Sequence, residues 1–398
     1  MNVELRLNKN NGYKFLFVLI WCQNTILGYL RGFIGLGVLY DILFFLIVTV
    51  CVLPFLLDFK RKISLHALSS VVWIVFSFLF TYVFANTKII DLLQENVFSF
   101  FLTVFPYFFA GLFFTVAHND KDRFYKLIYV LSCVAIICAI LYTFYYMATG
   151  RSWQLEDNMN TAYNNMLSVA YIIWYMNKKT QIFNTVMAIS GMVFMIAMGT
   201  RGAILALAIW FLVCFLSYGN NKTKLLKIFI IFFVGILMLL LMTGAFEVLL
   251  ISAKKTFNAM GLNTRIFDYF ITGAISDGNG REEIYKIAFE NISYLPKGIY
   301  ADVSLIGVYV HNLFLEVLID YGYILGSVFI LALGGSVFGA IRCRTDKDTK
   351  MFYLLLVCCI LTKLMFSSSL FLDPWFFYLW GLSIQMLSHK GGMINEVA

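Results

Sequence analysis

An arginine and a histidine in the C-terminal part of the chain are the residues best suited to chemistry. Arg281 opens an amphipathic stretch, and His311 stands further along, at the start of an apolar run. A guanidinium group binds phosphate through two parallel hydrogen bonds, and a neutral imidazole accepts a proton from a hydroxyl group. The pair therefore points to chemistry on a phosphate-linked substrate.

Each of these two residues also has a purely structural interpretation. Arg281 could pair with a neighbouring acid, Glu282 or Glu283, and His311 could be a helix cap or a core residue. The position of His311 at the N-terminal end of an apolar run nevertheless disfavours the imidazolium form, because the helix dipole is positive there. We therefore expect a neutral imidazole.

Two further arginines are candidates for binding an anion. Arg201 lies in a tight turn between Gly199 and Gly202, where the free N–H groups of the following helix would add to its charge. Its alternative is an arginine that reaches up to the lipid headgroups. Arg265 is the other arginine of residues 244–311, the long segment that also contains Arg281.

Three residues are expected to support the site. Tyr285 follows Arg281 by about one helical turn, and Glu316 follows His311 closely enough to orient its imidazole. Asp41 lies inside an apolar run, where a charged carboxylate is costly. We therefore expect it to have a functional role and a cationic partner such as Arg31 or Arg201.

Two other charges are given simpler roles. Lys363 lies in an apolar run and is expected to neutralise an acid, since a lone charge there is costly. Asp373 is expected to be an ordinary surface charge.

The elements that position these residues are predicted to be membrane helices. Of the 398 residues, 61% are hydrophobic and only 13% are charged, well below the share in a soluble domain. Apolar runs long enough to cross a bilayer recur along the chain, and they are continuous rather than alternating, which excludes an outer-membrane barrel. The eight cysteines show neither a disulfide framework nor a zinc pattern. The predicted fold is all-α and polytopic.

Twelve membrane spans are predicted from the apolar runs. Basic residues gather on alternate connections, and the positive-inside rule places these and both termini in the cytoplasm. This pattern explains the net charge of +8 without any nucleic acid. The predicted spans are 13–30, 34–57, 65–85, 98–117, 124–147, 161–177, 182–200, 202–218, 225–243, 312–338, 350–368 and 371–388.

The chain is accordingly divided into three parts. Residues 1–243 hold nine spans, residues 244–311 form a long outward-facing loop, and residues 312–398 hold the last three spans. A loop of that length needs structure of its own, and we expect amphipathic helices in it. One helix is predicted from apolar residues at helical spacing after Arg281: Ile284, Ile287, Ala288 and Ile292.

Three short motifs, in this order, resemble the O-antigen polymerase and O-antigen ligase superfamily. They are Thr200-Arg201-Gly202 at an outward turn, Gly280-Arg281 opening a helix, and His311-Asn312 followed by Leu315, Glu316 and Gly322. One departure is Tyr285, since members of that family often carry a tryptophan after the loop arginine.

The resemblance implies a glycosyltransferase of the C type in the bacterial inner membrane, with its active site facing outward. Its donor would be a glycan on undecaprenyl pyrophosphate, bound by Arg201 and Arg281, while His311 would activate the attacking hydroxyl. No metal or other cofactor is implied, and the outward connections show no D-x-D-type acidic pair. The implied partners are lipid-linked donor and acceptor, membrane lipids and a chain-length regulator protein.

Among the functions compatible with the motifs, we expect a polysaccharide polymerase, which moves the growing glycan onto the next lipid-linked repeat unit. The alternatives are an O-antigen ligase, which transfers the polymer to lipid A core, and a flippase or other transporter of lipid-linked oligosaccharide. A transporter is expected to carry its charges at the membrane midplane, whereas here they gather in the outward loop.

Overall fold

The computed structural model describes most of the chain as helix, and within the described residues it contains no strand. These residues are 9–34, 37–56, 65–114, 121–148, 155–178, 182–198, 200–217, 245–259, 264, 267–268, 271, 281–343 and 345–389. The all-α prediction is therefore confirmed for this part of the chain.

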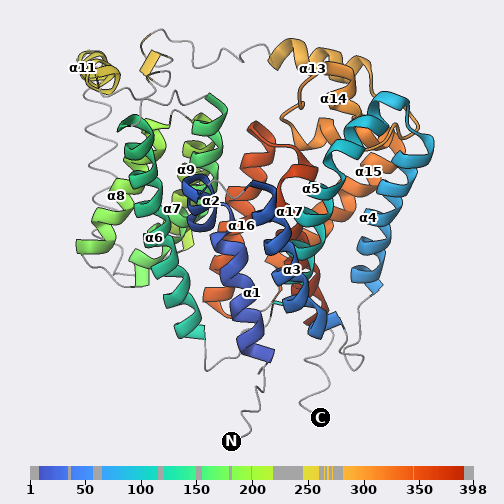
Figure 1. The fold of residues 1–398 in the computed structure, drawn as a ribbon, viewed down its shortest axis with the longest axis horizontal. Coiled ribbons are helices and arrows are strands. Elements are labelled where there is room, and N and C mark those ends of the chain that lie inside the picture. Colours follow the sequence, from blue (N-terminus) through green and yellow to red (C-terminus); the bar gives the residue numbers. More distant parts are fainter. Residues whose placement is uncertain are drawn as a thin grey trace, which may run out of the picture. The chain divides into compact units, whose positions relative to one another are not determined.

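The helices divide into two compact units (Figure 1). The first unit comprises Met1–Gln23, Leu30–Tyr125 and Gly280–Ala398, and the second comprises Asn24–Tyr29 and Lys126–Asn279. Both of the residues singled out first, Arg281 and His311, belong to the first unit.

The first unit is built from three stretches of sequence that are far apart in the chain. Its elements are α1 (Lys9–Gln23), α3 (Gly37–Leu56), α4 (Leu65–Phe84), α5 (Thr87–Leu112), α13 (Arg281–Glu290), α14 (Ala301–Ile306), α15 (Leu313–Ile341), α16 (Lys347–Phe366), the 3₁₀ helix η4 (Leu370–Leu372) and α17 (Pro374–His389).

The second unit has α7, α8 and α9 packed against one another. Its helices are α7 (Leu155–Lys178), α8 (Ile182–Ala197), α9 (Arg201–Ser217) and α11 (Ala245–Ala259). Two more helices, α2 (Ile26–Ile34) and α6 (Lys121–Ala148), contribute residues to both units.

Four described helices are long and apolar enough to cross a membrane: His66–Phe84, Lys121–Tyr145, Leu313–Ile341 and Lys347–Phe366. Shorter apolar helices cover Tyr13–Gln23, Ile42–Val52, Ile182–Ala197 and Gly202–Ser217. The length and apolar composition of these helices make the chain a helical membrane protein. The predicted total of twelve spans stays a prediction, and the predicted span 225–243 lies outside the described residues.

Two predicted spans differ in their bounds from the helices that the structure shows there. The first, 13–30, is two helices, because α1 ends at Gln23 and α2 begins at Ile26 after a turn. The fourth was predicted to begin at residue 98, but α5 begins at Thr87, where the side chain of Asn86 accepts a hydrogen bond from the N–H of Ile89.

The closest helix packing in the first unit joins α5 to α17. Gly111 on α5 lies against the backbone of Tyr378, and Gly381 on α17 lies against the backbone of Phe108, so that a Cβ atom at either glycine would overlap a carbonyl oxygen. Small residues that allow two helix backbones to approach are the usual device of membrane helix pairs. Around this contact the ring of Phe108 packs edge-on against Trp380, with 5.7 Å between ring centroids.

Helix α15 is kinked at Gly322, whose φ is 71°. The chain segment before α14 fits into this kink, where the N–H of Tyr323 donates to the carbonyl of Ser293 at 2.8 Å. A side chain at Gly322 would collide with the backbone of Leu295. With 29 residues, α15 is about 43 Å long and exceeds a hydrocarbon core of about 30 Å.

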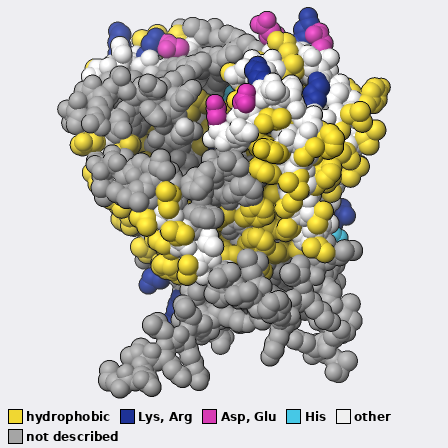
Figure 2. All heavy atoms as spheres, turned by 45° about the vertical axis from the view of Figure 1, so that its right-hand side comes forward, with side chains coloured by type: hydrophobic (Ala, Val, Ile, Leu, Met, Phe, Trp, Pro, Cys, Tyr) yellow, Lys and Arg dark blue, Asp and Glu magenta, His cyan; other side chains and the backbone are white. Residues whose placement is uncertain are grey.

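The surface of the first unit has an apolar band and a charged end. On the face drawn in Figure 2, hydrophobic side chains cover the middle, and charged side chains gather at the upper end, where Figure 1 places α13 and α14. On α15 the exposed apolar residue Phe314 lies before the kink, and Ile324, Val328, Leu331 and Phe338 lie after it.

Candidate functional site

Helix α13 is placed by a small hydrophobic cluster. Its Ala288 is fully buried against residues of α5, α14 and α15, and the half-buried Ile284 and Tyr285 pack onto the same cluster. The predicted helix after residue 280 is confirmed, because its apolar positions recur on one face. This packing fixes the helix that carries Arg281 at its first residue.

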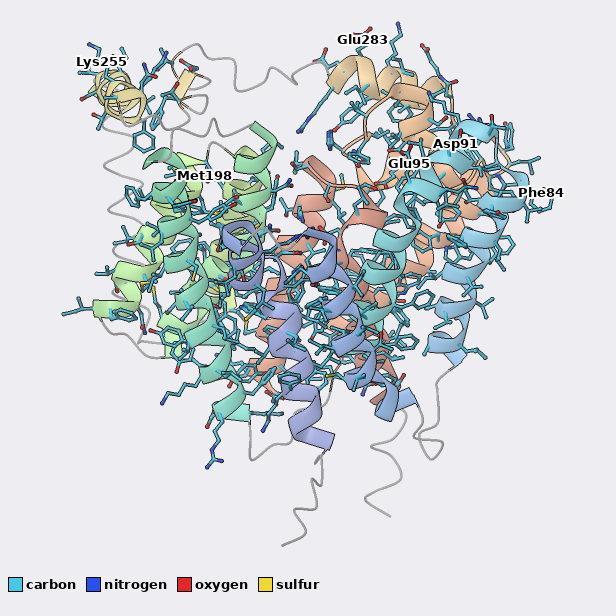
Figure 3. The ribbon with its side chains drawn as sticks, viewed as in Figure 1. Phe84, Asp91, Glu95, Met198, Lys255 and Glu283 are labelled. Atoms are coloured by element: carbon cyan, nitrogen blue, oxygen red, sulfur yellow. The ribbon has the colours of Figure 1, made fainter. Side chains whose placement is uncertain are left out.

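The guanidinium group of Arg281 is held by the end of another helix. One of its terminal nitrogens donates to the carbonyl oxygen of Phe366, the last residue of α16, at 2.7 Å. Arg281 forms no ion pair with Glu282 or Glu283, which are both exposed, and Figure 3 shows Glu283 at the outer side of α13. The alternative in which Arg281 serves only to pair with a neighbouring acid is therefore wrong. A guanidinium has five N–H donors, so others remain for a ligand.

His311 occupies an unusual backbone position just before α15. Its φ is 54°, in the left-handed region that few residues other than glycine adopt. The imidazole is half-buried, lies edge-on to the ring of Tyr309, and has no hydrogen-bond partner for Nδ1 among the described residues. Such strain at a polar residue is typical of functional sites.

Arg281 lies close enough to His311 for its charge to act on the imidazole. Burial lowers the pKa of His311, and the positive charge of Arg281 lowers it further. The imidazole is therefore neutral at neutral pH, in agreement with the prediction, although burial rather than a helix dipole is the main cause. In such an arrangement the guanidinium group can bind an anion, and the neutral imidazole can accept a proton.

Three of the predicted site residues cannot be assigned contacts. Arg201 begins α9 in the second unit and Asp41 lies within α3, but neither side chain is among those described. Arg265 lies outside the described residues. Their roles stay predictions.

The two supporting residues near the site have structural partners. Tyr285 packs against the hydrophobic cluster under α13. The carboxylate of Glu316, which is 1% exposed, accepts hydrogen bonds from the hydroxyl of Ser369 and the N–H of Leu370. Glu316 thus fastens the connection between α16 and α17, whereas we had expected it to orient His311.

Lys363 and Asp373 form an ion pair at 2.8 Å. Lys363 therefore neutralises an acid, as predicted. The prediction for Asp373 is wrong, because this side chain is completely buried and its second oxygen accepts from the N–H groups of Trp375 and Phe376 at the start of α17. The pair lies at the same helix end that receives Arg281.

The sequence does not predict the roles of two buried carboxylates near the site. Asp302 and Asp320 are 1% and 0% exposed, and both accept hydrogen bonds from backbone N–H groups of the segment 297–312, which we name the anchored segment. No periodicity or motif marks them. Their hydrogen-bond partners depend on how the segment 297–312 folds back onto α15.

Within the described residues, no group of three His, Cys, Asp or Glu side chains could hold a metal ion.

Comparison of the chain with protein-family models, with curated proteins and with solved structures finds no match.

Proposed function

We propose that this protein is a membrane glycosyltransferase that acts on glycans carried by a polyprenyl pyrophosphate, and that it works as a polysaccharide polymerase. The observation that supports this most is the pairing of Arg281 with a neutral, strained His311 at the charged end of an otherwise apolar helical unit. The sequence motifs that contain these two residues point in the same direction.

The proposed reaction needs two things from the protein. The hydroxyl oxygen of the acceptor sugar forms a bond to the anomeric carbon of the donor glycan, and the bond from that carbon to the pyrophosphate breaks. The pyrophosphate leaves with the electron pair, so Arg281 stabilises the charge that develops on it. The proton of the hydroxyl passes to the neutral imidazole of His311.

The surroundings of Arg281 suit this task. Its bond to the carbonyl of Phe366 orients the guanidinium and uses one of the five N–H donors, which leaves donors for two oxygens of a pyrophosphate. Apolar helices of the same unit are suitable neighbours for a polyprenyl tail.

The test is the surface glycan of the producing bacterium, displayed by length on a gel. Arg281→Ala is expected to abolish the polymer ladder while single repeat units still reach the surface. Arg281→Lys is expected to restore little, because lysine cannot form the two parallel bonds. Glu283→Gln, an exposed neighbour on α13, is the control and should keep the full ladder.

Two outcomes in Arg281→Ala would contradict the proposal, and one in Arg281→Lys would contradict the role of Arg281. Accumulation of repeat units on the inner face in Arg281→Ala would indicate a transporter. A polymer of normal length that stays on its lipid would indicate a ligase. A ladder of normal length in Arg281→Lys would reduce Arg281 to a generic positive charge.

A further inference from the structure

The beginning of the anchored segment is bound to α15 by both the main chain and the side chain of Asp320. The main-chain carbonyl of Asp320 accepts from the N–H groups of Lys297 and Gly298 at 2.9 and 3.0 Å. Its carboxylate accepts from the N–H of Ala301 at 3.0 Å. The kink at Gly322 lies two residues further on, close to the point where α15 receives the segment. The beginning of α14 is therefore fixed relative to α15.

Asp302 then ties the beginning of α14 to the residue before His311. One carboxylate oxygen accepts from the N–H of Val303 at 2.8 Å, and the other accepts from the N–H of Val310 at 3.1 Å. The side chain is 1% exposed. A single buried carboxylate thus closes the loop that runs from α14 to His311.

His311 is held from both sides by its neighbours rather than by its own side chain. Val310 is fully buried and its N–H is bound by Asp302. On the other side the side chain of Asn312 accepts from the N–H groups of Phe314 and Leu315 and caps α15. A histidine in the left-handed region persists only where its surroundings impose that conformation, and these two contacts impose it.

From this geometry we infer that Asp302 is a positioning residue, which holds His311 in place for proton transfer from the acceptor hydroxyl. This role rests on the proposed function. The anchoring of Val310 does not, and it can be measured separately.

Only the ionised form of Asp302 accepts hydrogen bonds on both oxygens without competition from its own proton, so the ionised form orients the N–H of Val310 best. Burial raises the pKa of Asp302 to about 6. The group is therefore largely ionised at pH 7.5 and protonated at pH 5. The titratable or charged groups of the anchored segment around it are Lys297, Tyr300, Tyr309 and His311. Those on the helices packed against the segment are Glu316, Asp320, Arg281 and Lys88.

Hydrogen–deuterium exchange of the purified full-length protein, followed by mass spectrometry of peptides that cover 304–312, measures the anchoring. In Asp302→Asn the amide cannot accept on both sides, so protection of this segment should fall by about tenfold. The matched control is Asp91→Asn, because Asp91 is exposed on α5 of the same unit (Figure 3) and its loss should change nothing. Unchanged protection in a folded Asp302→Asn protein overturns the inference.

The unsubstituted protein supplies a second measurement that does not depend on how the variant folds. After correction for intrinsic exchange rates, protection of 304–312 should be at least about threefold higher at pH 5 than at pH 7.5, because Asp302 binds a proton in the closed segment that it does not bind when the segment opens to water. Equal protection at the two pH values overturns the inference.

The kinetics of glycan transfer test whether Asp302 positions His311 for proton transfer. Asp302→Asn should lower kcat by about tenfold or more with little change in KM for the donor, because a displaced imidazole affects proton transfer and not pyrophosphate binding. It should also lessen the fall in kcat as the pH decreases through about 6, and leave the fall that protonation of His311 itself causes. A variant that loses protection but keeps normal kcat and pH profile overturns the positioning role. If the unsubstituted protein transfers no glycan, the proposed function fails, and the exchange data still decide the anchoring.

Discussion

Two regions of the first unit are stabilised in opposite ways. The α5–α17 pair is held by direct backbone approach at Gly111 and Gly381 and by aromatic packing. The anchored segment is held by hydrogen bonds from backbone N–H groups to the buried carboxylates of Asp302 and Asp320. The first arrangement depends on shape and the second on charge. Only the second responds to pH, and it is the one that carries His311.

The largest expected effect comes from breaking the shape-dependent region. Gly111→Ala introduces a Cβ atom against the backbone of Tyr378, which cannot move without shifting a helix, and should destabilise the protein by at least about 3 kcal/mol. The measurement is the melting temperature in detergent. Gly335→Ala is the matched control, since a Cβ there meets nothing within 4 Å. Equal melting temperatures for the two variants would show that the helices are not in close contact.

The next effect concerns the charge-dependent region. Because burial raises the pKa of Asp302 to about 6, the folded state binds a proton between about pH 4 and pH 6 that the unfolded state does not. The stability contributed by this group therefore decreases as pH rises through that window, by about 3 kcal/mol in total. Thermal denaturation of the parent protein and of Asp302→Asn across this range should differ by that slope. Parallel curves would mean that Asp302 titrates normally.

A smaller effect tests the strain at His311. Glycine adopts a positive φ freely, so His311→Gly should keep or raise stability, by up to about 1 kcal/mol, although transfer is lost. His311→Val should lower stability, because a branched side chain is disfavoured in this conformation. Melting temperatures of the two variants give the comparison, and the reverse order would contradict the assigned backbone conformation.

The sequence predicted the elements that follow from apolar periodicity, and it missed features that depend on long-range folding. Helix α13 was found because its apolar residues recur on one face, and His311 was found because an apolar run begins after it. The start of α5 was missed because its first turns carry Lys88, Asp91 and Glu95, which a search for apolar runs passes over.

The parts of the site that were missed have a common cause. The roles of Asp302 and Glu316 are set by the residues they meet across the fold, Val310 for the one and Ser369 with Leu370 for the other. Asp373 was taken for a surface charge because nothing in its neighbouring sequence reveals that Lys363 reaches it. Composition and spacing contain no information on such pairs.

The most direct test of the central proposal uses purified protein in lipid vesicles, supplied with polyprenyl-pyrophosphate-linked repeat units from a strain that cannot polymerise them. Mass spectrometry of the lipid-linked products measures their length. The account predicts that the parent protein and Glu283→Gln extend the glycan, whereas Arg281→Ala and His311→Ala leave single units. Extension by His311→Ala at the parental rate, or no extension by the parent protein, would contradict it.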